Sequence, residues 1–586
     1  MEPLKLAPRR VDARRDGNAL YLSSPDPLRE PPSTLGDMLR ESAARAPERD
    51  FLVERASDGG LRRVTWSEAL AQAEGIASWL LATQAPGTPV MALSPNSVDL
   101  ALLMLGCFLA GAPFVPVSPA YSLLSQDLAK LRAVYAKVKP GVVYAAPAAQ
   151  YARAVEALAP ETFLERLPTH SPLPLPEIAP GSTAKILFTS GSTGFPKGVV
   201  NTHRMLCANQ QMMTQCWPFL AEPGATPPVL VDWLPWSHTF GGNHNFNLVL
   251  FHAGTILVDE GRPAPGAIAA TLANLRDLPP TVYLTVPAGY AALVPRLERD
   301  HGLARAFFSR LQVAFYAAAA LPPDLWHRLV TLAKEHADHE VFMTTAWGST
   351  ETSPLATSTH FSVPAAGNIG LPTPGTTLKL VPNGSKLEVL VKGPSVMTEY
   401  LDEPELTRAA FDDEGFYRMG DAMKLADPED PAAGLVFDGR VAEDFKLASG
   451  TWVSVTVVRT GLVAEAGGII ADVVVCGHDR EHLGILAWPS MAGCAAIAGE
   501  QSLAALSVAD VVRDHLATTL ARWNATNPAS SMRIARALLL GEPPSIDAGE
   551  ITDKGYTNQR ATIEHRAEAV AALFADPPPA GVLVLP

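Results

Sequence analysis

The stretch from Ile186 to His203, ILFTSGSTGFPKGVVNTH, constrains this chain more than any other part of the sequence. It begins with an apolar, β-prone run and then breaks into Ser190–Gly198, which holds three glycines, three hydroxyl side chains and one lysine. Glycine N–H groups can approach an anion closely, hydroxyls donate short hydrogen bonds, and an ammonium balances charge. A plain hairpin turn can share this composition. The order differs from the Gly-x4-Gly-Lys-Ser/Thr loop, because Pro196 precedes Lys197 and a glycine follows it. The stretch predicts a polyphosphate site.

Length and composition narrow the class of protein. With 586 residues the chain is too long for one core, so several domains are expected. Hydrophobic residues make up 47% and charged residues 18%, which suits a large globular protein, and a net charge of −14 disfavours nucleic acid as a partner. The five scattered cysteines disfavour disulfide and zinc frameworks. The N-terminus lacks an apolar signal core and Leu100–Ala112 is short for a bilayer span, so we expect a soluble, reduced, cytoplasmic protein with no membrane span.

Short apolar runs alternate with helical patterns through most of the chain. A helix is expected near Thr34–Ala44, and another after the capping box Thr65-x-x-Glu68. Val90–Leu93, Ser97–Ala110 and Phe114–Val117 predict a βαβ unit and therefore a parallel sheet. Further strands are predicted at Val142–Ala145, Val229–Val231, Thr255–Val258, Thr281–Thr285, Val313–Tyr316 and Val341–Thr345. The pattern becomes β-rich from Leu378, and a smaller α/β unit follows Gly439, with strands near Ile469–Val475, Ile485–Ala487 and Arg533–Leu538 and a helix near Val508–Trp523.

Four segments together carry a resemblance to a known family. They are the loop above, Ala346–Thr352 (AWGSTET), Tyr417–Asp421 (YRMGD) and Asp438–Arg440 (DGR). In this order they resemble the AMP-forming acyl-CoA synthetases of the adenylate-forming superfamily. The resemblance implies an α/β fold: a large N-terminal domain of layered α/β sheets with a β-rich subdomain, and a small mobile α/β C-terminal domain. We expect an N-terminal extension over 1–32, the large adenylation domain over 33–440, a hinge at 441–444 and the small domain over 445–586.

The resemblance also implies roles for individual residues. In the phosphate loop, the residues expected to bind ATP are Thr189, Ser190, Gly191, Ser192, Thr193, Gly194 and Lys197. Trp347 would stack on or flank the adenine, and Thr350 would contact the α-phosphate. Glu351 would hold Mg²⁺, a hard cation that prefers carboxylate and phosphate oxygens. Asp421 would accept hydrogen bonds from the ribose, and Arg440 would reach the ribose or phosphate. Read alone, Ala346–Thr352 could be an ordinary helix entry and Tyr417–Asp421 an acidic turn.

The sequence near the C-terminus resembles the mobile-domain loop of the family. In Asp547–Gly555 (DAGEITDKG), Lys554 would be the adenylation lysine, whereas a lone lysine is normally a solvated surface residue. The family often has Gly-Lys directly, and here Glu-Ile-Thr-Asp separates Gly549 from Lys554. A second departure is Phe315–Pro322 (FYAAAALP), where alanines replace a Gly-Gly-Ala segment of the adenine pocket.

Leu234–Asn243 (LPWSHTFGGN) matches the segment that lines the acyl pocket in the family. His238 would lie between the carboxylate and the nucleotide, although a lone histidine is more often a satisfied core residue. Amino-acid-activating relatives carry an aspartate here, and none lies between Leu234 and Asn247, which disfavours amino acids. Together with VAEDFKLASGTWVS and DAGEITDKGYTNQRA, this segment most resembles feruloyl-CoA synthetases. The resemblance implies an aromatic or hydroxycinnamic acid such as ferulate.

The expected reaction uses ATP, Mg²⁺ and CoA to convert a carboxylic acid into an acyl-adenylate and then a thioester. Three alternatives stay open: another acid, a carrier protein as acceptor, or an inactive nucleotide-binding regulator. Lys554 and Glu351 argue against the regulator. The sequence sets no oligomeric state, and a homodimer is one arrangement that it allows.

Overall fold

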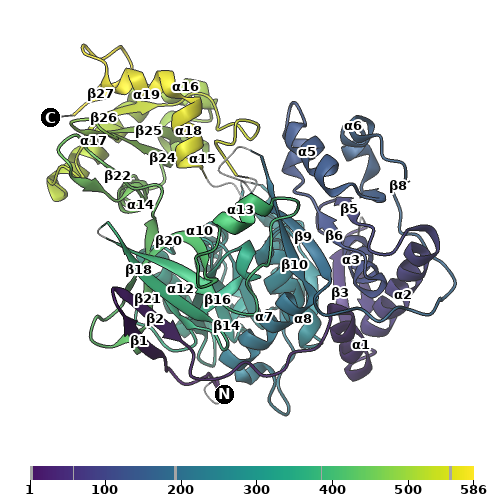
Figure 1. Ribbon diagram of the computed structural model, residues 1–586. Coiled ribbons are helices and arrows are strands. Elements are labelled where there is room, and N and C mark those ends of the chain that lie inside the picture. The colour runs from purple at the N-terminus through teal and green to yellow at the C-terminus, as the bar shows by residue number, and fades with distance from the viewer. Residues whose placement is uncertain are drawn as a thin grey trace.

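The computed structural model describes residues 4–56, 58–189, 195–264, 266–384, 386–552 and 557–585. It is a mixed α/β protein with a large N-terminal part and a small C-terminal part, as the sequence predicts (Figure 1). The small part, drawn in yellow-green, lies to one side of the large part and is joined to it by a narrow connection. None of the described helices combines the length and the apolar run that a bilayer crossing requires.

The first sheet of the large part carries the phosphate-loop stretch. Its strands lie in the order β10-β9-β6-β5-β7-β8, and β5 runs parallel to β6 and β7. This confirms the parallel sheet expected from the βαβ pattern. The strands are β5 (Val90–Leu93), β6 (Phe114–Pro116), β7 (Val142–Ala145), β8 (Phe163–Leu164), β9 (Thr183–Thr189) and β10 (Lys197–Thr202). All four residues of β5 and of β7 are buried, because helices cover both faces.

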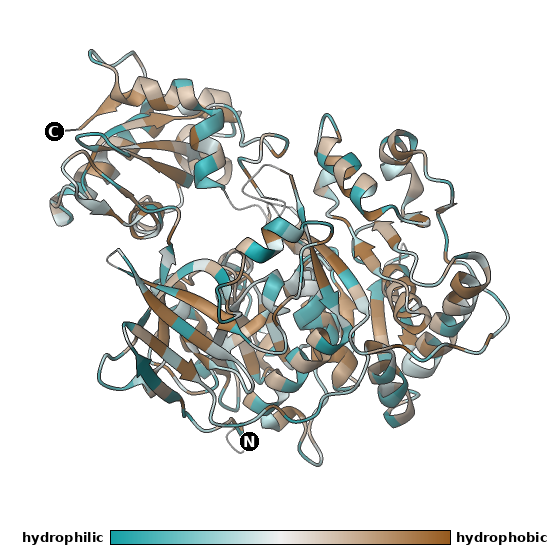
Figure 2. Ribbon diagram, in the orientation of Figure 1, coloured by the Kyte–Doolittle hydropathy of each residue, from teal (hydrophilic) through white to brown (hydrophobic). Residues whose placement is uncertain are grey.

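Helix α3 (Val98–Ala110) is the centre of the largest core. It is apolar on nearly every side and twelve of its thirteen residues are buried, so it packs as an internal helix. Ser97 caps its N-terminus by accepting from Leu100 N at 3.0 Å, and Gly111 ends it in the left-handed region. The capping box at Thr65 and Glu68 starts α2 (Trp66–Thr83), which packs against α3. Figure 2 shows α3 and the strands beside it largely in brown, with more teal on the outer helices.

Two further sheets contain the other strands of the large part. The sheet β11-β12-β3-β4 contains β3 (Asp50–Arg55), β4 (Leu61–Thr65), β11 (Val229–Asp232) and β12 (Thr255–Val258). An 11-stranded sheet begins with the parallel strands β13 (Val282–Thr285), β14 (Val313–Tyr316) and β15 (Phe342–Gly348). It continues through the antiparallel strands β16 (Leu355–Ser358), β17 (Asn368–Pro372), β18 (Thr377–Asn383), β19 (Lys386–Lys392), β20 (Tyr417–Leu425) and β21 (Leu435–Arg440). These antiparallel strands form the β-rich region expected from Leu378.

The N-terminal residues also enter this sheet. The hairpin of β1 (Asp12–Asp16) and β2 (Ala19–Ser23) pairs with β18, and Leu20 and Leu22 are buried. The sequence predicts only a polar extension here, because the pairing partner lies far along the chain.

The C-terminal part has its own sheet, β24-β25-β26-β27, and its own cores. Its strands are β22 (Phe445–Lys446), β23 (Trp452–Val453), β24 (Ile470–Cys476), β25 (Leu483–Pro489), β26 (Ile534–Leu539) and β27 (Leu583–Val584). Strand β27 gives the apolar C-terminal segment a place against β26. The contacts between the parts include the pair of Lys386 with Asp444, and Gln126 N donating to Asp547 Oδ2 at 2.8 Å. The domain boundaries and the hinge pivot stay predictions.

The helices complete the two parts. In the large part they are α1 (Leu35–Arg45), α4 (Ala120–Leu123), α5 (Ala129–Val138), α6 (Ala148–Leu158), α7 (His203–Cys216), η1 (Pro218–Leu220), η2 (Phe240–Asn245), α8 (Phe246–Phe251), α9 (Ile268–Asp277), α10 (Pro287–Arg299), α11 (His301–Phe308), α12 (Pro323–His336), η3 (Thr350–Thr352), α13 (Pro404–Ala409) and η4 (Pro431–Ala433). In the small part they are α14 (Val455–Glu465), α15 (Met491–Ala498), α16 (Leu503–Val508), α17 (Asp510–Thr526), α18 (Gln559–His565) and α19 (Ala567–Phe574).

Candidate active site

The two strands that flank the phosphate loop form a closed hairpin. Thr189 ends β9, Lys197 begins β10, and the two residues are direct partners in the antiparallel register. The loop residues predicted to bind phosphate, Ser190, Gly191, Ser192, Thr193 and Gly194, lie outside the described residues. The Lys197 ammonium lies 5.3 Å from the centroid of the Tyr400 ring. The predicted ATP-binding lysine is therefore held beside an aromatic face.

Tyr400 belongs to a segment that no sequence motif marks. Leu401 N donates to Gly198 O at 2.8 Å, so backbone hydrogen bonds join this segment to β10. The Tyr400 hydroxyl donates to Glu351 Oε1 at 3.0 Å and lies 3.3 Å from the Tyr417 hydroxyl. Burial raises the pKa of the Tyr400 phenol, and the Glu351 charge adds to that effect. Tyr400 therefore stays a neutral donor to Glu351. Its only sequence signal was one tyrosine within a polar stretch.

Glu351 sits in the short helix η3, just after β15. Its backbone carbonyl accepts from Met397 N at 2.7 Å, and Thr350 beside it is 5% exposed. The turn requires Gly348, because a Cβ there would lie 1.6 Å from the Pro354 carbonyl oxygen. Among the described residues no group of three His, Cys, Asp or Glu side chains could cage a metal. One carboxylate with phosphate oxygens is instead the usual environment of Mg²⁺ in nucleotide sites, and Glu351 fits that arrangement.

Trp347, Asp421 and Arg440 form a second group of contacting side chains. Trp347 Nε1 donates to Asp421 Oδ2 at 2.9 Å, and Arg440 Nε lies 2.9 Å from Asp421 Oδ1. Burial raises the pKa of the Asp421 carboxyl, and the Arg440 charge opposes that rise. The Arg440 side chain is 53% exposed. The structure thus brings together three residues that are far apart in sequence, and their roles toward adenine, ribose and phosphate stay predictions.

The predicted acyl segment follows β11, whose end lies beside the end of β13. Val229 N donates to Thr281 Oγ1 at 2.8 Å and Trp233 Nε1 to Thr285 Oγ1 at 3.2 Å. Because β13, β14 and β15 are parallel, the acyl segment and Trp347, which is near the end of β15, lie at carboxyl ends of strands on one edge, where α/β proteins commonly bind ligands. His238 is 8% exposed, and its carbonyl accepts from Gly242 N at 2.8 Å.

The acyl segment continues as a π-helix, η2. A Cβ at Gly242 would lie 2.3 Å from the Trp236 carbonyl oxygen, so glycine permits the close approach of the two turns. π-Helical turns are rare and often occur at functional sites. The side chains of Phe240 and His244 project from η2 toward Phe315 on β14, with ring centroids 5.7 and 5.1 Å from that of Phe315.

Helix α7 ties the acyl segment to the nucleotide residues. Asn209 Nδ2 donates to the carbonyl oxygens of Thr352 and Leu355, at 3.3 and 2.9 Å. The neighbouring Gln210 Nε2 donates to Asn243 O in η2 at 2.9 Å. Two adjacent amides on one helix therefore fix the positions of both segments.

Lys185 anchors η2 to the strand that leads into the phosphate loop. Its side chain on β9 is fully buried, and Nζ donates to Gly242 O at 2.7 Å. Burial lowers the pKa of the Lys185 ammonium to about 7. None of the ion pairs between described residues includes this lysine, and the Phe108 ring lies 5.5 Å away. Nothing in the sequence distinguishes this residue from an ordinary surface lysine.

The model of one protein family covers most of this site, up to Leu401. The AMP-binding enzyme model matches residues 39–401. The chain belongs to the AMP-binding enzyme family. The matched range includes the phosphate loop, the acyl segment and the Trp347–Glu351 turn.

Several curated relatives of this AMP-binding enzyme are CoA ligases for different acids. A methyl-dioxo-octahydro-indenyl propanoyl:CoA ligase of Rhodococcus jostii is 25% identical over 493 residues, covering 78% of this chain and 88% of the relative. A medium-chain fatty-acid–CoA ligase of Escherichia coli is 25% identical over 488 residues, covering 77% and 80%. Several other matches span about half of the relative, such as a mitochondrial malonate–CoA ligase of Mus musculus, 28% identical over 50% of this chain and 53% of that protein.

Solved structures of the same fold cover nearly the whole chain. The A domain of a carboxylic acid reductase from Segniliparus rugosus has a TM-score of 0.70 at 19% identity and covers 93% of this chain and 94% of its own. An o-succinylbenzoate CoA synthetase of Bacillus subtilis has a TM-score of 0.65 at 17% identity, covering 91% and 98%. These likenesses establish the fold.

Lys554, the predicted adenylation lysine of this AMP-binding enzyme, lies outside the described residues. The start of its loop is anchored on the small part, because Glu550 is buried and pairs with Arg566, Nε to Oε1 at 2.6 Å. Asp547 in the same loop accepts from Gln126 N of the large part at 2.8 Å. The loop therefore begins at the contact between the two parts.

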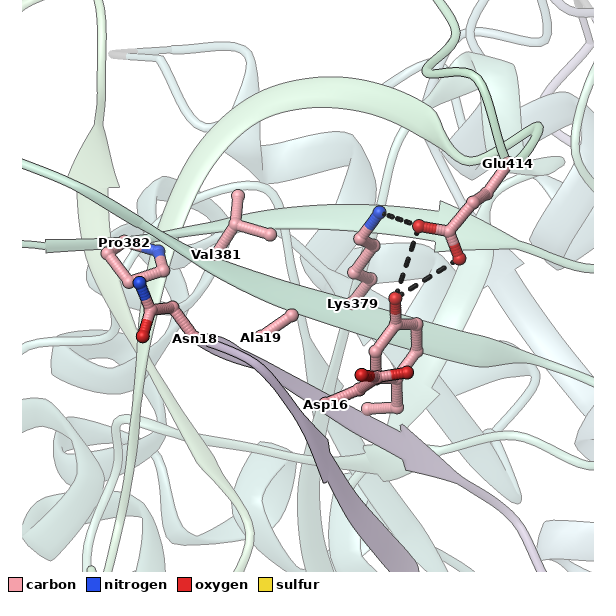
Figure 3. A pocket seen from close by; sticks show the side chains of 8 residues that line it. Asp16, Asn18, Ala19, Lys379, Val381, Pro382 and Glu414 are labelled. Carbon is pink, nitrogen blue, oxygen red and sulfur yellow. Dashed lines mark hydrogen bonds and ion pairs between the residues drawn. The ribbon is translucent and has the colours of Figure 1, made fainter.

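An open depression of about 580 Å³ lies on the 11-stranded sheet, away from these residues (Figure 3). Asp16, Tyr21, Lys379 and Glu414 are among its lining residues. The Lys379 ammonium points to Glu414 and also pairs with Asp412 Oδ2 at 2.8 Å. Because its cation is already neutralised by two carboxylates, this depression has no charge left for an anionic substrate.

Proposed function

We propose that the protein is an AMP-forming acid:CoA ligase that activates an aromatic or hydroxycinnamic acid such as ferulate. One observation carries the ligase proposal. Glu351 and Lys197 both contact Tyr400, and Asp421 joins Trp347 to Arg440 in the same region. A carboxylate for a cation, a lysine beside a phosphate loop and a carboxylate for a ribose are what an ATP-dependent adenylation requires.

In the proposed first step the substrate carboxylate attacks the α-phosphorus of ATP and pyrophosphate leaves, which yields an acyl-adenylate. Lys197 orients the leaving pyrophosphate, and Thr350 donates to the α-phosphate. Lys554 neutralises the charge that develops on the phosphate. Tyr400 holds the Glu351 carboxylate in place, and Mg²⁺, when bound there, would neutralise phosphate charge. Positioning and charge stabilisation supply most of the catalysis.

In the proposed second step the CoA thiol attacks the acyl carbonyl carbon, the thiol proton leaves, and AMP is expelled. The small domain would rotate about residues 441–444 between the steps, withdrawing Lys554 and admitting CoA. The contact between Gln126 N and Asp547 must break during such a rotation, because its two residues belong to different parts.

The assignment of the acid rests on the rings around η2. His244 stacks on Phe315, with centroids 5.1 Å apart and an interplanar angle of 27°, and Phe240 meets His244 edge-on at 5.6 Å. Trp217 approaches Phe315 edge-on at 6.0 Å. Aromatic side chains favour contact with a flat aryl group over contact with a flexible chain. The curated relatives act on acids that differ widely, so family membership supports the ligase chemistry more than the acid.

A pyrophosphate-release assay with ferulate, run with and without CoA, tests the proposal. The expected result is ATP-dependent pyrophosphate release with ferulate, and feruloyl-CoA and AMP once CoA is added. Adenylate without thioester would point to a carrier-protein acceptor. Turnover with aliphatic acids alone would refute the aromatic assignment, and no turnover on a broad panel of acids would favour a nucleotide-binding regulator.

A further inference from the structure

Three buried side chains form a hydrogen-bonded relay that ends at the aromatic cluster. Asp232 closes β11 and is 1% exposed, and Asn245 and His244 occupy the last two positions of η2. Asn245 Nδ2 lies 3.1 Å from Asp232 Oδ1, and His244 Nδ1 lies 3.0 Å from Asn245 Oδ1. The relay thus runs from a buried carboxyl group to an imidazole ring.

The donors and acceptors in this relay follow from one backbone group. Leu234 N–H donates to Asp232 Oδ1 at 3.2 Å, so Oδ1 is an acceptor whether or not the carboxyl carries a proton on its other oxygen. Asn245 must then present its NH₂ group to Asp232 and its oxygen to His244. His244 must therefore donate from Nδ1, and its burial lowers the pKa of the imidazole to about 4, which keeps the ring neutral. A neutral ring protonated on Nδ1 has a bare acceptor at Nε2.

That acceptor has no partner within the described part of the chain. His244 is 2% exposed, and Nε2 makes no hydrogen bond to any described residue. The rings of Phe240 and Phe315 lie next to the imidazole, and Phe240 is only half-buried. A buried acceptor left without a donor is costly, and such groups are uncommon in folded proteins. An acceptor fixed in this state is suited to a ligand that brings its own donor.

We propose that His244 Nε2 accepts a hydrogen bond from a hydroxyl group on the aryl ring of the acid. Asp232 and Asn245 act as positioning residues that hold His244 in the required tautomer. The inference rests on the proposed function, because it assumes that an aryl acid enters the cluster. It adds a criterion that the aromatic side chains do not supply, since they pack on a phenyl ring and on a phenol ring alike.

A series of acids tests the contact on the unmodified protein. Thioester formation is measured with 4-hydroxycinnamate, 4-methoxycinnamate and cinnamate, which present a donor, only an acceptor and neither. We expect kcat/KM for the hydroxy acid to exceed that for the other two by about 10- to 100-fold. Equal kcat/KM for all three acids would refute the hydroxyl contact and leave the ligase proposal standing. Thioester with none of the three would refute the aryl-acid assignment and this contact with it.

Two variants and one control test the relay. His244→Phe keeps a ring on Phe315 but removes the acceptor, so the ratio of kcat/KM for the hydroxy acid to kcat/KM for cinnamate should fall to about one. Asn245→Leu removes the oxygen that holds the proton of His244 on Nδ1. The preference for the hydroxy acid should then fall several-fold. His252 is a matched control, because it is also buried but its Nε2 already lies 2.9 Å from Thr214 Oγ1. His252→Phe should keep the wild-type ratio. A His244→Phe enzyme with the wild-type ratio would overturn the proposal.

Discussion

Replacing Lys185 by methionine should change how the stability of the protein depends on pH. Burial lowers the pKa of this ammonium from 10.5 to about 7. While the lysine is charged in both the folded and the unfolded state, this burial lowers the free energy of unfolding by about 5 kcal/mol. Below pH 7 the folded and unfolded states both carry the charge, and the full cost applies. Above pH 7 the folded state releases its proton while the unfolded state keeps its own, so the cost falls by up to about 1.4 kcal/mol per pH unit.

Methionine fills a similar volume and carries no charge, so its own contribution does not vary with pH. It also leaves the Gly242 carbonyl without its donor, a constant loss of about 1–3 kcal/mol. Relative to Lys185→Met, the wild-type protein should therefore gain roughly 2 kcal/mol in its free energy of unfolding between pH 7 and pH 9. The other titrating groups are common to both proteins and cancel in the difference.

Urea unfolding of the two proteins at half-unit steps from pH 6 to pH 9 measures this difference. Lys424→Met is a suitable control, because this side chain is 62% exposed and the same substitution there removes no buried ammonium. If the free energies of unfolding of the wild type and of Lys185→Met change with pH in parallel, the idea that a buried ammonium destabilises the folded protein is refuted. Such a result would mean that the lysine is solvated or paired in the folded protein.

Three further changes test other parts of the site. Tyr400→Phe removes the hydrogen bond to Glu351, so pyrophosphate release should slow about tenfold and need more Mg²⁺ for half-maximal rate; an unchanged Mg²⁺ titration would contradict the role of Tyr400. Ala318 adopts a left-handed backbone with φ of +72°, so Ala318→Gly should stabilise the protein by about 1 kcal/mol in thermal unfolding, and a destabilised variant would show that this backbone is not strained. Lys554→Ala should abolish most adenylation while keeping ATP binding, measured by pyrophosphate release and calorimetry; normal adenylation would remove the lysine from the mechanism.

Local signals predicted the elements of the fold closely. The capping box at Thr65 starts a helix where expected, and Val90–Leu93 and Val142–Ala145 are strands over the predicted residues. These predictions are correct because a capping residue or an apolar run determines the structure of only the few residues around it. The pairing of β2 with β18 joins positions far apart in the chain, and no local pattern encodes it.

The residues of the site also fall into two groups, those that a sequence motif indicates and those whose role depends on distant partners. The family resemblance named Trp347, Asp421 and Arg440, and the structure brings them into contact. It did not indicate Tyr400 or Lys185, because their importance comes from partners on other elements, Glu351 for the tyrosine and η2 for the lysine. A tyrosine or a lysine has an ordinary appearance in a sequence until its neighbours in space are known.

The N-terminal hairpin has a practical consequence for anyone who expresses this protein. Strand β1 is exposed along its whole length and carries Asp12, Arg14, Arg15 and Asp16, which makes it a charged outer edge of a large sheet. Removing residues 1–32, the predicted extension, would leave the backbone of β18 unpaired on one side and would delete the buried side chains of Leu20 and Leu22. Exposed edges of this kind recruit strands from other molecules, and charged edge strands prevent it. The shortened protein should aggregate while its active-site residues remain intact, so a purification tag is better placed ahead of Met1 than in exchange for the first residues.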